Sequence, residues 1–351
     1  VSDTELELNA TTIDMNGNLD LSGTINGISI LADATNFTDS ILISQNASTG
    51  TLSSATDNVG IGDDVFASLT SGRNSVAIGS NAMDANTSGK NNVAVGHDAL
   101  SGNTTADNNT AIGKSALEAN TTGANNTAVG ALSLDANTTG NNNVAVGINS
   151  LSANTTAEAN TAVGTNALMV NTTGTQNVAI GQSALDANTT ASNNTAVGYQ
   201  SLTGTTTGAN NTAVGMNSMV ANTTGGSNVA IGGSALTANT TASSNVAVGN
   251  DALASNTTGA GNTAIGAEAL DSNTTGGYSV AIGNRALQAN TDISGNVAIG
   301  ADAMYTNTVG DKCVAVGSDA LKLNTTAVHC TAIGHSALTA NTTGGNNTAV
   351  G

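Results

Sequence analysis

A short alternation of apolar and small side chains recurs along most of the chain. In the stretch Asn74-Ser75-Val76-Ala77-Ile78-Gly79, Val and Ile are separated by a single Ala. Successive side chains of a β-strand point to opposite faces, so the Val and the Ile share one face and the Ala takes the other. The glycine ends the alternation, because a turning backbone needs a freedom in φ that residues with a Cβ lack. The pattern predicts a short strand that ends at a glycine corner.

This element returns every seventeen residues without an insertion, with its glycine at every seventeenth position from 62 to 351. Leu or Met stands four residues after each glycine from Met83 onward, and Asn stands seven residues after it, with Thr205 as the exception. The consensus is N-[VT]-A-[VI]-G-x-x-[AS]-[LM]-x-x-N-T-T-[GA]-x-x. A fixed period of this kind is the signature of a repeat architecture.

The remainder of each repeat holds a second short piece and a turn. The piece [AS]-[LM]-x-x is too short for a stable helix, and we interpret it as a second short strand. The piece N-T-T-[GA] has the composition of a turn, because Asn and Thr side chains bond to the nearby backbone. One repeat therefore predicts one coil of a parallel β-solenoid, in which identical residues stack at ~4.8 Å and the whole stack is a rod on the order of 80 Å long. One extra residue would displace an apolar column from the core, which explains why insertions are absent.

The Asn column seven residues after the glycine has two interpretations. Stacked amides inside a turn satisfy backbone groups of their own and of neighbouring coils. The same N-T-T also forms an acceptor sequence for N-glycosylation. We favour the ladder, since a recurring position within one chain is most simply a structural requirement of each coil.

The first fifty-seven residues do not follow the seventeen-residue phase. They contain alternating apolar residues and two Asn-Gly turn signals, Asn16-Gly17 and Asn26-Gly27, which predict short strands joined by tight turns. We therefore divide the chain into a β-rich shaft or cap segment with a connector, 1–57, and a solenoid, 58–351. Because the chain starts at Val1 and stops at Gly351 within a repeat, we expect it to be a window on a longer polypeptide.

Composition narrows the range of functions. The chain has no Pro or Trp, only three Tyr and two Phe, and a formal net charge of −18 with six Lys and Arg residues. Without large side chains it has to build a thin core. The acidic balance argues against nucleic acid as a partner, because binding to phosphates requires basic side chains. No run of eighteen apolar residues is present, so we expect no membrane insertion of this segment.

The strand motif resembles the head repeats of trimeric autotransporter adhesins, whose motif N-S-V-A-I-G is matched at residues 74 to 79. The longer pattern is similar to repeats in fibre proteins of tailed bacteriophages. The resemblance implies a left-handed parallel β-roll that assembles as a homotrimer, with the strands packed about the threefold axis. Seventeen residues per repeat rather than about fourteen, and the lack of a neck, stalk or membrane anchor, favour a fibre over an autotransporter.

Candidate chemistry is sparse, and we expect no enzyme activity and no cofactor. His97 and His335 both follow the corner glycine but lie fourteen coils apart, and His329 lies in another column, whereas zinc needs three or four converging ligands. The column two residues after the glycine places Arg285 among carboxylates, where it would relieve like-charge repulsion. Calcium between Asp302 and Asp319 is the alternative, although calcium takes six to eight oxygen ligands.

The most distinctive local feature is a pair of cysteines in the column that opens the strand. Cys313 and Cys330 are seventeen residues apart, so they should be stacked neighbours at ~4.8 Å. That spacing lies within the Cα range of a disulfide, and two stacked free thiols are the alternative.

These features together favour a structural role. We expect a rigid trimeric spacer of a phage tail fibre or a similar extracellular appendage, which presents an attachment domain and contacts other fibre or baseplate proteins. The alternative is a multivalent adhesin that binds a host surface polymer or matrix protein directly. Ice binding is a third class, which we disfavour because adjacent threonines in a turn point in different directions.

Overall fold

The computed structural model describes residues 24–25, 28–34, 37–44 and 49–351, and in this part of the chain all regular secondary structure is β. Eighteen three-residue strands, one per coil, form a single parallel stack. The strands are β5 (Val59–Ile61), β6 (Val76–Ile78), β7 (Val93–Val95), β8 (Thr110–Ile112), β9 (Thr127–Val129), β10 (Val144–Val146), β11 (Thr161–Val163), β12 (Val178–Ile180), β13 (Thr195–Val197), β14 (Thr212–Val214), β15 (Val229–Ile231), β16 (Val246–Val248), β17 (Thr263–Ile265), β18 (Val280–Ile282), β19 (Val297–Ile299), β20 (Val314–Val316), β21 (Thr331–Ile333) and β22 (Thr348–Val350).

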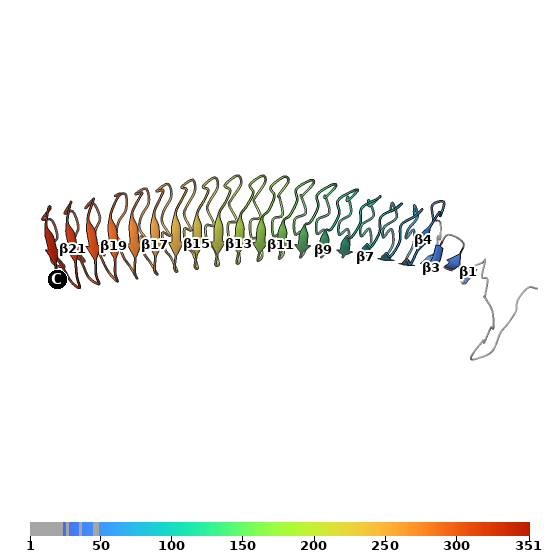
Figure 1. Cartoon of the computed structure of the whole chain (residues 1–351), viewed down its shortest axis with the longest axis horizontal. Helices are drawn as coiled ribbons and strands as arrows, with labels where there is room; N and C mark the ends of the chain where they lie inside the picture. The colour runs from blue at the N-terminus through green and yellow to red at the C-terminus, as the bar shows by residue number, and fades with distance from the viewer. Residues whose placement is uncertain (1–23, 26–27, 35–36, 45–48) are drawn as a thin grey trace, which may run out of the picture.

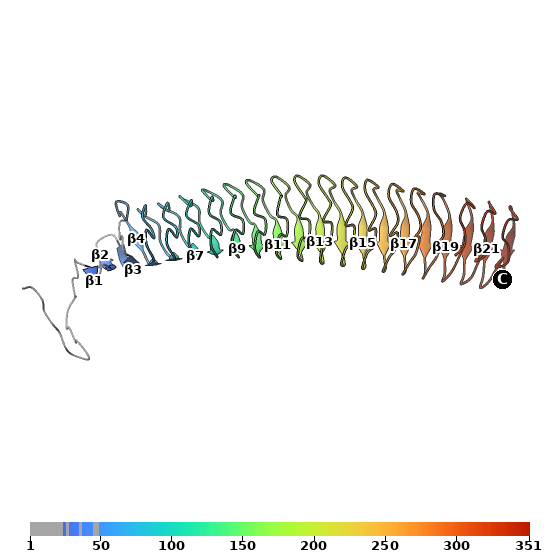
Figure 2. The same cartoon turned by 180° about the vertical axis from the view of Figure 1, so that it is seen from behind.

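From β5 to β22, each strand pairs with the strand one repeat away, so the predicted register holds throughout the solenoid. Ala145 of β10, for example, is paired with Ala128 of β9 and with Ala162 of β11. The coils form a long, thin rod that bends gently, as both side views show (Figures 1 and 2). The predicted parallel β-solenoid of seventeen-residue coils is confirmed.

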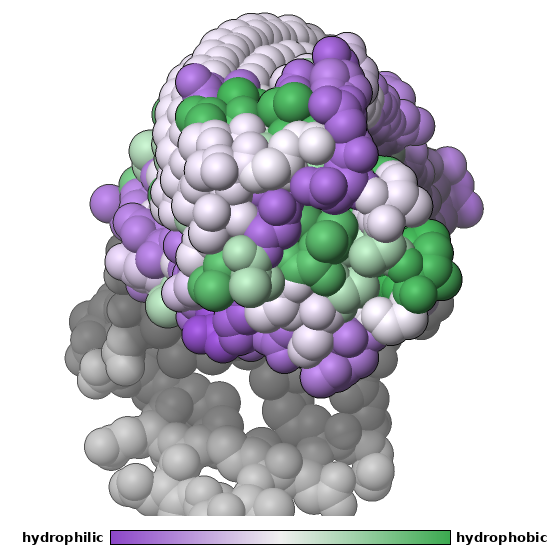
Figure 3. Space-filling model, turned by 90° about the vertical axis from the view of Figure 1, so that its left-hand side faces the viewer, coloured by the Kyte–Doolittle hydropathy of each residue, from purple (hydrophilic) through white to green (hydrophobic). Residues whose placement is uncertain are grey.

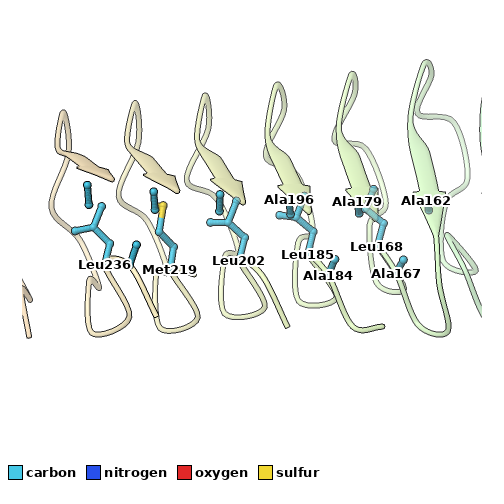
Figure 4. Packing of buried hydrophobic residues seen from close by; sticks show 14 of the residues in the cluster. Ala162, Ala167, Leu168, Ala179, Ala184, Leu185, Ala196, Leu202, Met219 and Leu236 are labelled. Carbon is cyan, nitrogen blue, oxygen red and sulfur yellow. The ribbon is translucent and has the colours of Figure 1, made fainter. Parts of the chain in front are cut away.

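The core is a narrow seam made from two kinds of side chain. The central Ala of each strand from β6 to β21 is fully buried, as at Ala196, and the Leu or Met of the same coil packs against it from the other side, as at Leu202. Figure 4 shows these residues repeating from coil to coil. A Leu opposite an Ala fills the space between the two walls, so the chain forms a core without large aromatic residues.

The predicted second strand is wrong. The [AS]-[LM]-x-x piece is a turn in every coil, and its Leu lies in the left-handed region, with a φ of 53° at Leu134. The residue two positions earlier, Leu132, also has a positive φ, of 55°. Left-handed backbone costs a residue with a Cβ roughly 1–2 kcal/mol. Burial of the Leu side chain and bonds to the next coil offset this cost.

Hydrogen bonds between coils are not confined to the strands. In the turn, the N–H groups of Leu134 and Ala136 donate to the carbonyl oxygens of Ser150 and Ser152 in the following coil, at 3.0 and 3.2 Å. The N–H of Thr138 donates to the carbonyl of Thr155 at 2.8 Å. The stack therefore satisfies backbone groups around most of each coil, which a thin structure needs because buried unpaired groups are costly.

Two ladders of buried asparagines run along the rod. In the predicted ladder, the amide nitrogen of Asn137 donates to Oδ1 of Asn120 at 2.8 Å and to the carbonyl of Gly140 at 3.1 Å. Thr205 interrupts this ladder on one side: its hydroxyl accepts from Asn222, but Oδ1 of Asn188 in the preceding coil is left without a hydrogen-bond partner. Asn137 has no exposed surface, and a glycan acceptor nitrogen must be accessible. The ladder interpretation is confirmed, and the glycosylation alternative is wrong for the buried asparagines.

The second ladder, which sequence reasoning did not identify, lies at the residue directly before each strand. The backbone N–H of Asn126 donates to Oδ1 of Asn109 at 2.9 Å, and Nδ2 of Asn126 donates to the carbonyl of Gly140 at 2.9 Å. Each amide therefore joins a neighbouring coil to the turn of its own coil. Cys313 and Cys330 occupy this column.

Strand pairing continues into the segment 1–57. β3 (Phe37–Ser44) pairs in parallel with β5 and with β4 (Ala55–Thr56), and it pairs antiparallel with β2 (Ile28–Ala34). β2 also pairs antiparallel with β1 (Thr24–Ile25), as expected of a short hairpin. The boundary predicted between 57 and 58 is therefore not a break in the sheet. The predicted turns at Asn16-Gly17 and Asn26-Gly27 lie outside the described residues.

The corner glycines provide a test of the stacking. Gly232 has a φ of +139°, and a Cβ there would overlap the carbonyl of Gly249, whereas a Cβ on the next residue, Gly233, would meet only Nδ2 of Asn250 at 3.4 Å. Gly232→Ala should lower the free energy of unfolding by roughly 2–4 kcal/mol, from backbone strain and overlap. Gly233→Ala should leave it within about 0.5 kcal/mol. Urea unfolding followed by circular dichroism measures both, and equal stability of the two variants would contradict the prediction.

Candidate interaction surface

The outer side of the sheet is a continuous uncharged surface on which most side chains are apolar. We call it the sheet face and define it as the first and third residues of strands β5 to β22, which point away from the core. The first residue is Val or Thr and the third is Val or Ile in all eighteen strands, so none of them carries a charge.

The third residue of a strand is substantially exposed in the strands near the middle of the rod that have Ile there. The accessible fraction is 40% at Ile180 of β12 and 41% at Ile231 of β15. The first residue is half-buried in most strands. At ~4.8 Å between strands and ~7 Å between alternate residues, the sheet face measures about 80 Å by 7 Å, or roughly 560 Å². This equals the largest apolar patches of ordinary monomers, which often mark interaction sites.

The end view shows hydrophobic residues at the surface beside strongly hydrophilic ones (Figure 3). Only the third-column Val and Ile and the first-column Val and Thr extend along the entire stack, whereas other exposed apolar side chains, such as Met216 and Tyr278, are local. The sheet face is therefore the one candidate for an interaction surface that repeats at every coil.

Charged side chains meet near the coils of residues 268 to 322. Arg285 pairs with Asp302 at 2.9 Å, as predicted, and its guanidinium carbon lies 5.1 Å from the ring centre of Tyr305. Glu268 accepts a hydrogen bond from Gln288 at 2.8 Å. Such partly exposed pairs contribute little to stability.

Lys322 also belongs to this group and was missed by the sequence analysis. Its Nζ lies 2.9 Å from Asp302 and 2.7 Å from Asp319. The hydrogen bond from Lys322 lowers the pKa of Asp319, and the same bond raises the pKa of Lys322. The ammonium group occupies the place where calcium would have to bind. Among the described residues, no group of three or more His, Cys, Asp or Glu side chains is arranged to hold a metal ion.

The histidines are separate. His97 lies beside Asp98 at 2.5 Å, and His335 lies in the same column fourteen coils away, next to Ser336. His329 is exposed, directly before Cys330. The structure does not bring these side chains together.

The two cysteines are neighbours in the second ladder. Both are fully buried and both are free thiols. The backbone N–H of Cys330 donates to Sγ of Cys313 at 3.3 Å. Burial raises the pKa of the Cys313 thiol to about 11.

No family model matches the chain, and no curated protein matches it. The described part of the chain contains no helix with the length and apolar character that crossing a membrane requires.

Four partly buried carboxylates predict that the stability of the fold depends on pH. Burial raises the pKa values of Asp84, Asp135, Asp186 and Asp271 above the ordinary 3.8. Because the folded protein holds these protons more tightly than the unfolded chain, stability rises as the pH falls from neutral through the raised pKa values toward 3.8. The melting temperature should therefore increase between pH 7 and about pH 4.5.

Asp135→Asn should raise the melting temperature at pH 7 and reduce its change with pH, because the neutral amide removes one of these groups. Asp319→Asn is the matched control, since the pKa of Asp319 is lowered and its loss should have the opposite effect. Differential scanning calorimetry at several pH values gives the comparison. A melting temperature that falls on mild acidification would contradict the prediction.

Proposed function

We propose that this chain is the rigid rod of a phage tail fibre or a similar extracellular appendage, assembled from three copies and serving to hold an attachment domain at a distance. The observation that carries the proposal is the sheet face. Eighteen consecutive coils present an uncharged pair of residues, Val or Thr and Val or Ile, on the outside of one continuous sheet.

A second copy of the chain suits this surface better than an unrelated partner. Two rods with the same spacing between coils can match side chain to side chain along their entire length, whereas a partner without that spacing loses register after a few coils. Closed symmetry is the usual outcome when identical surfaces associate. The number of three chains is supported by the resemblance to trimeric adhesin heads and phage fibres.

Regularity also supports a spacer. Corner glycine, core Leu or Met and ladder Asn are repeated with few exceptions, and hydrogen bonds join each coil to the next on several sides. In a repeat protein each unit contacts only its neighbours, so added coils increase length without altering the rest.

One observation favours the second candidate, direct adhesion. The second Thr of the N-T-T turn is exposed in eleven consecutive coils, from Thr105 to Thr275. A column of identical hydroxyl and methyl groups can bind a polymer weakly at each coil and strongly overall. Both candidates are compatible with assembly through the sheet face.

Charge placed on the sheet face should disrupt assembly. In the double variant Ile180→Asp/Ile231→Asp, carboxylates from several chains would be buried without partners, so association should weaken at least about tenfold. Thr190→Asp/Thr241→Asp is the matched control, because these exposed residues of the same coils lie outside the sheet face. Analytical ultracentrifugation measures assembly, and circular dichroism verifies the fold. Equal association of the two variants, or a monomeric parent protein, would overturn the proposed assembly.

Removing whole coils separates the two functions. Deletion of residues 182–215 removes two repeats and joins Gly181 to Met216 in phase. The rod should become shorter by about 10 Å, as measured by small-angle scattering, while attachment of the intact appendage to its host surface is unchanged. Attachment that falls in proportion to the coils removed, with assembly intact, would favour adhesion over the spacer.

A further inference from the structure

Cys313 and Cys330 replace two consecutive asparagines of the second ladder and take over their hydrogen bonds. In the asparagine coils, Oδ1 accepts the N–H of the next coil and Nδ2 donates to a carbonyl fourteen residues ahead. Here Sγ of Cys313 accepts the N–H of Cys330 at 3.3 Å and donates to the carbonyl of Ala327 at 3.3 Å. Sγ of Cys330 donates to the carbonyl of Gly344 at 3.3 Å. The two sulfur atoms therefore lie one above the other, in line with the ladder.

The surroundings of the sulfur atoms suit a cation better than a bare thiolate. Carbonyl oxygens of Ala327 and Gly344 point at them, and Sγ of Cys313 is also 3.4 Å from the carbonyl of Asp311. The oxygen end of a carbonyl dipole repels an isolated negative sulfur and attracts a positive ion.

The spacing distinguishes two reactions of a cysteine pair. Adjacent parallel strands lie ~4.8 Å apart, and β20 and β21, which follow the two cysteines, are paired in register. A disulfide needs the sulfur atoms ~2.05 Å apart, so at least one side chain would have to leave the hydrogen bonds that it makes here. Two metal–sulfur bonds of ~2.3 Å in a straight line span ~4.6 Å, which nearly equals the strand spacing.

We propose that Cys313 and Cys330 form a two-coordinate site for a soft monovalent metal ion of the Cu(I) or Ag(I) type, held between two stacked coils. Thiolate ligands select soft ions of this class. On binding, each thiol loses its proton to solvent, two sulfur–metal bonds form, and the oxidation state of the ion does not change. Zinc is disfavoured because no third or fourth ligand is adjacent among the described residues.

The burial of both thiols predicts slow uptake. The ion can enter only when a coil opens locally, and such openings have free energies below that of global unfolding. Uptake should therefore be accelerated by low concentrations of urea that do not unfold the rod.

Titration of the full chain with Ag(I), after the thiols have been reduced and the reductant has been removed under anaerobic conditions, tests the site. We expect one ion per chain, measured by elemental analysis after gel filtration, and the release of two protons per ion. Cys313→Asn and Cys330→Asn should each reduce the affinity at least about a hundredfold, because a two-coordinate site needs both sulfur atoms. These substitutions restore the residue found in most other coils, so the variants are expected to fold.

His329→Ala is the matched control, since His329 is exposed and directly precedes Cys330, and it should leave binding unchanged. Two ions per chain, or binding that survives both Asn variants, would overturn the proposal. A mild oxidant that converts the native pair to a disulfide, detected as the loss of two alkylatable thiols, would also overturn it, because the sulfur atoms would then prefer direct bonding at ~2.05 Å to the wider separation that a bridging ion requires.

Discussion

Hydrogen bonding between coils in strict register is the constraint on which the rest of this structure depends. Strand residues pair with the same residues one repeat away, as Ala128, Ala145 and Ala162 do, and turn residues do the same outside the strands. Because each position is stacked on itself, every property of a side chain is repeated along the rod. A small side chain inside makes a continuous thin core, an uncharged one outside makes a continuous uncharged surface, and an amide makes a ladder.

The stacking also explains why strained backbone is tolerated. Leu134 and its equivalents adopt a left-handed conformation that a side chain normally avoids. In exchange, the N–H of the residue reaches the next coil and the side chain enters the seam opposite the Ala of the strand. The corner positions require glycine for a different reason: the carbonyl of the next coil occupies the place where a Cβ would lie. The same stacking thus limits one position to glycine and permits strain at another.

The repeat length, the core Leu and the Asn ladder could all be predicted from the sequence, because stacking turns each of them into a periodic column. The conformation of the [AS]-[LM]-x-x turn could not, since four residues with one apolar side chain carry no period of their own. Lys322 was missed because it lies three residues from Asp319, in a different column, and only the fold brings it to Asp302. The residues of β3 and β5 that pair are eighteen rather than seventeen positions apart. A search at a fixed period of seventeen therefore does not include β3 in the stack. The alternation of the strand predicted an Ala face and a Val, Thr and Ile face without showing which one is buried. The burial of the Ala column shows that the Val, Thr and Ile face lies outside.

The first Asn ladder gives the rod a direction. Asn103 donates to Asn86, Asn120 to Asn103 and Asn137 to Asn120, so the amides are aligned and each one donates toward the N-terminus. The two ends of the stack therefore differ chemically: one offers carbonyl oxygens and the other amide hydrogens. A ribosome releases the N-terminal coils first, so each finished coil already presents the acceptor that the next coil requires. The coils are therefore synthesised in the same order in which each one can dock on the coil before it.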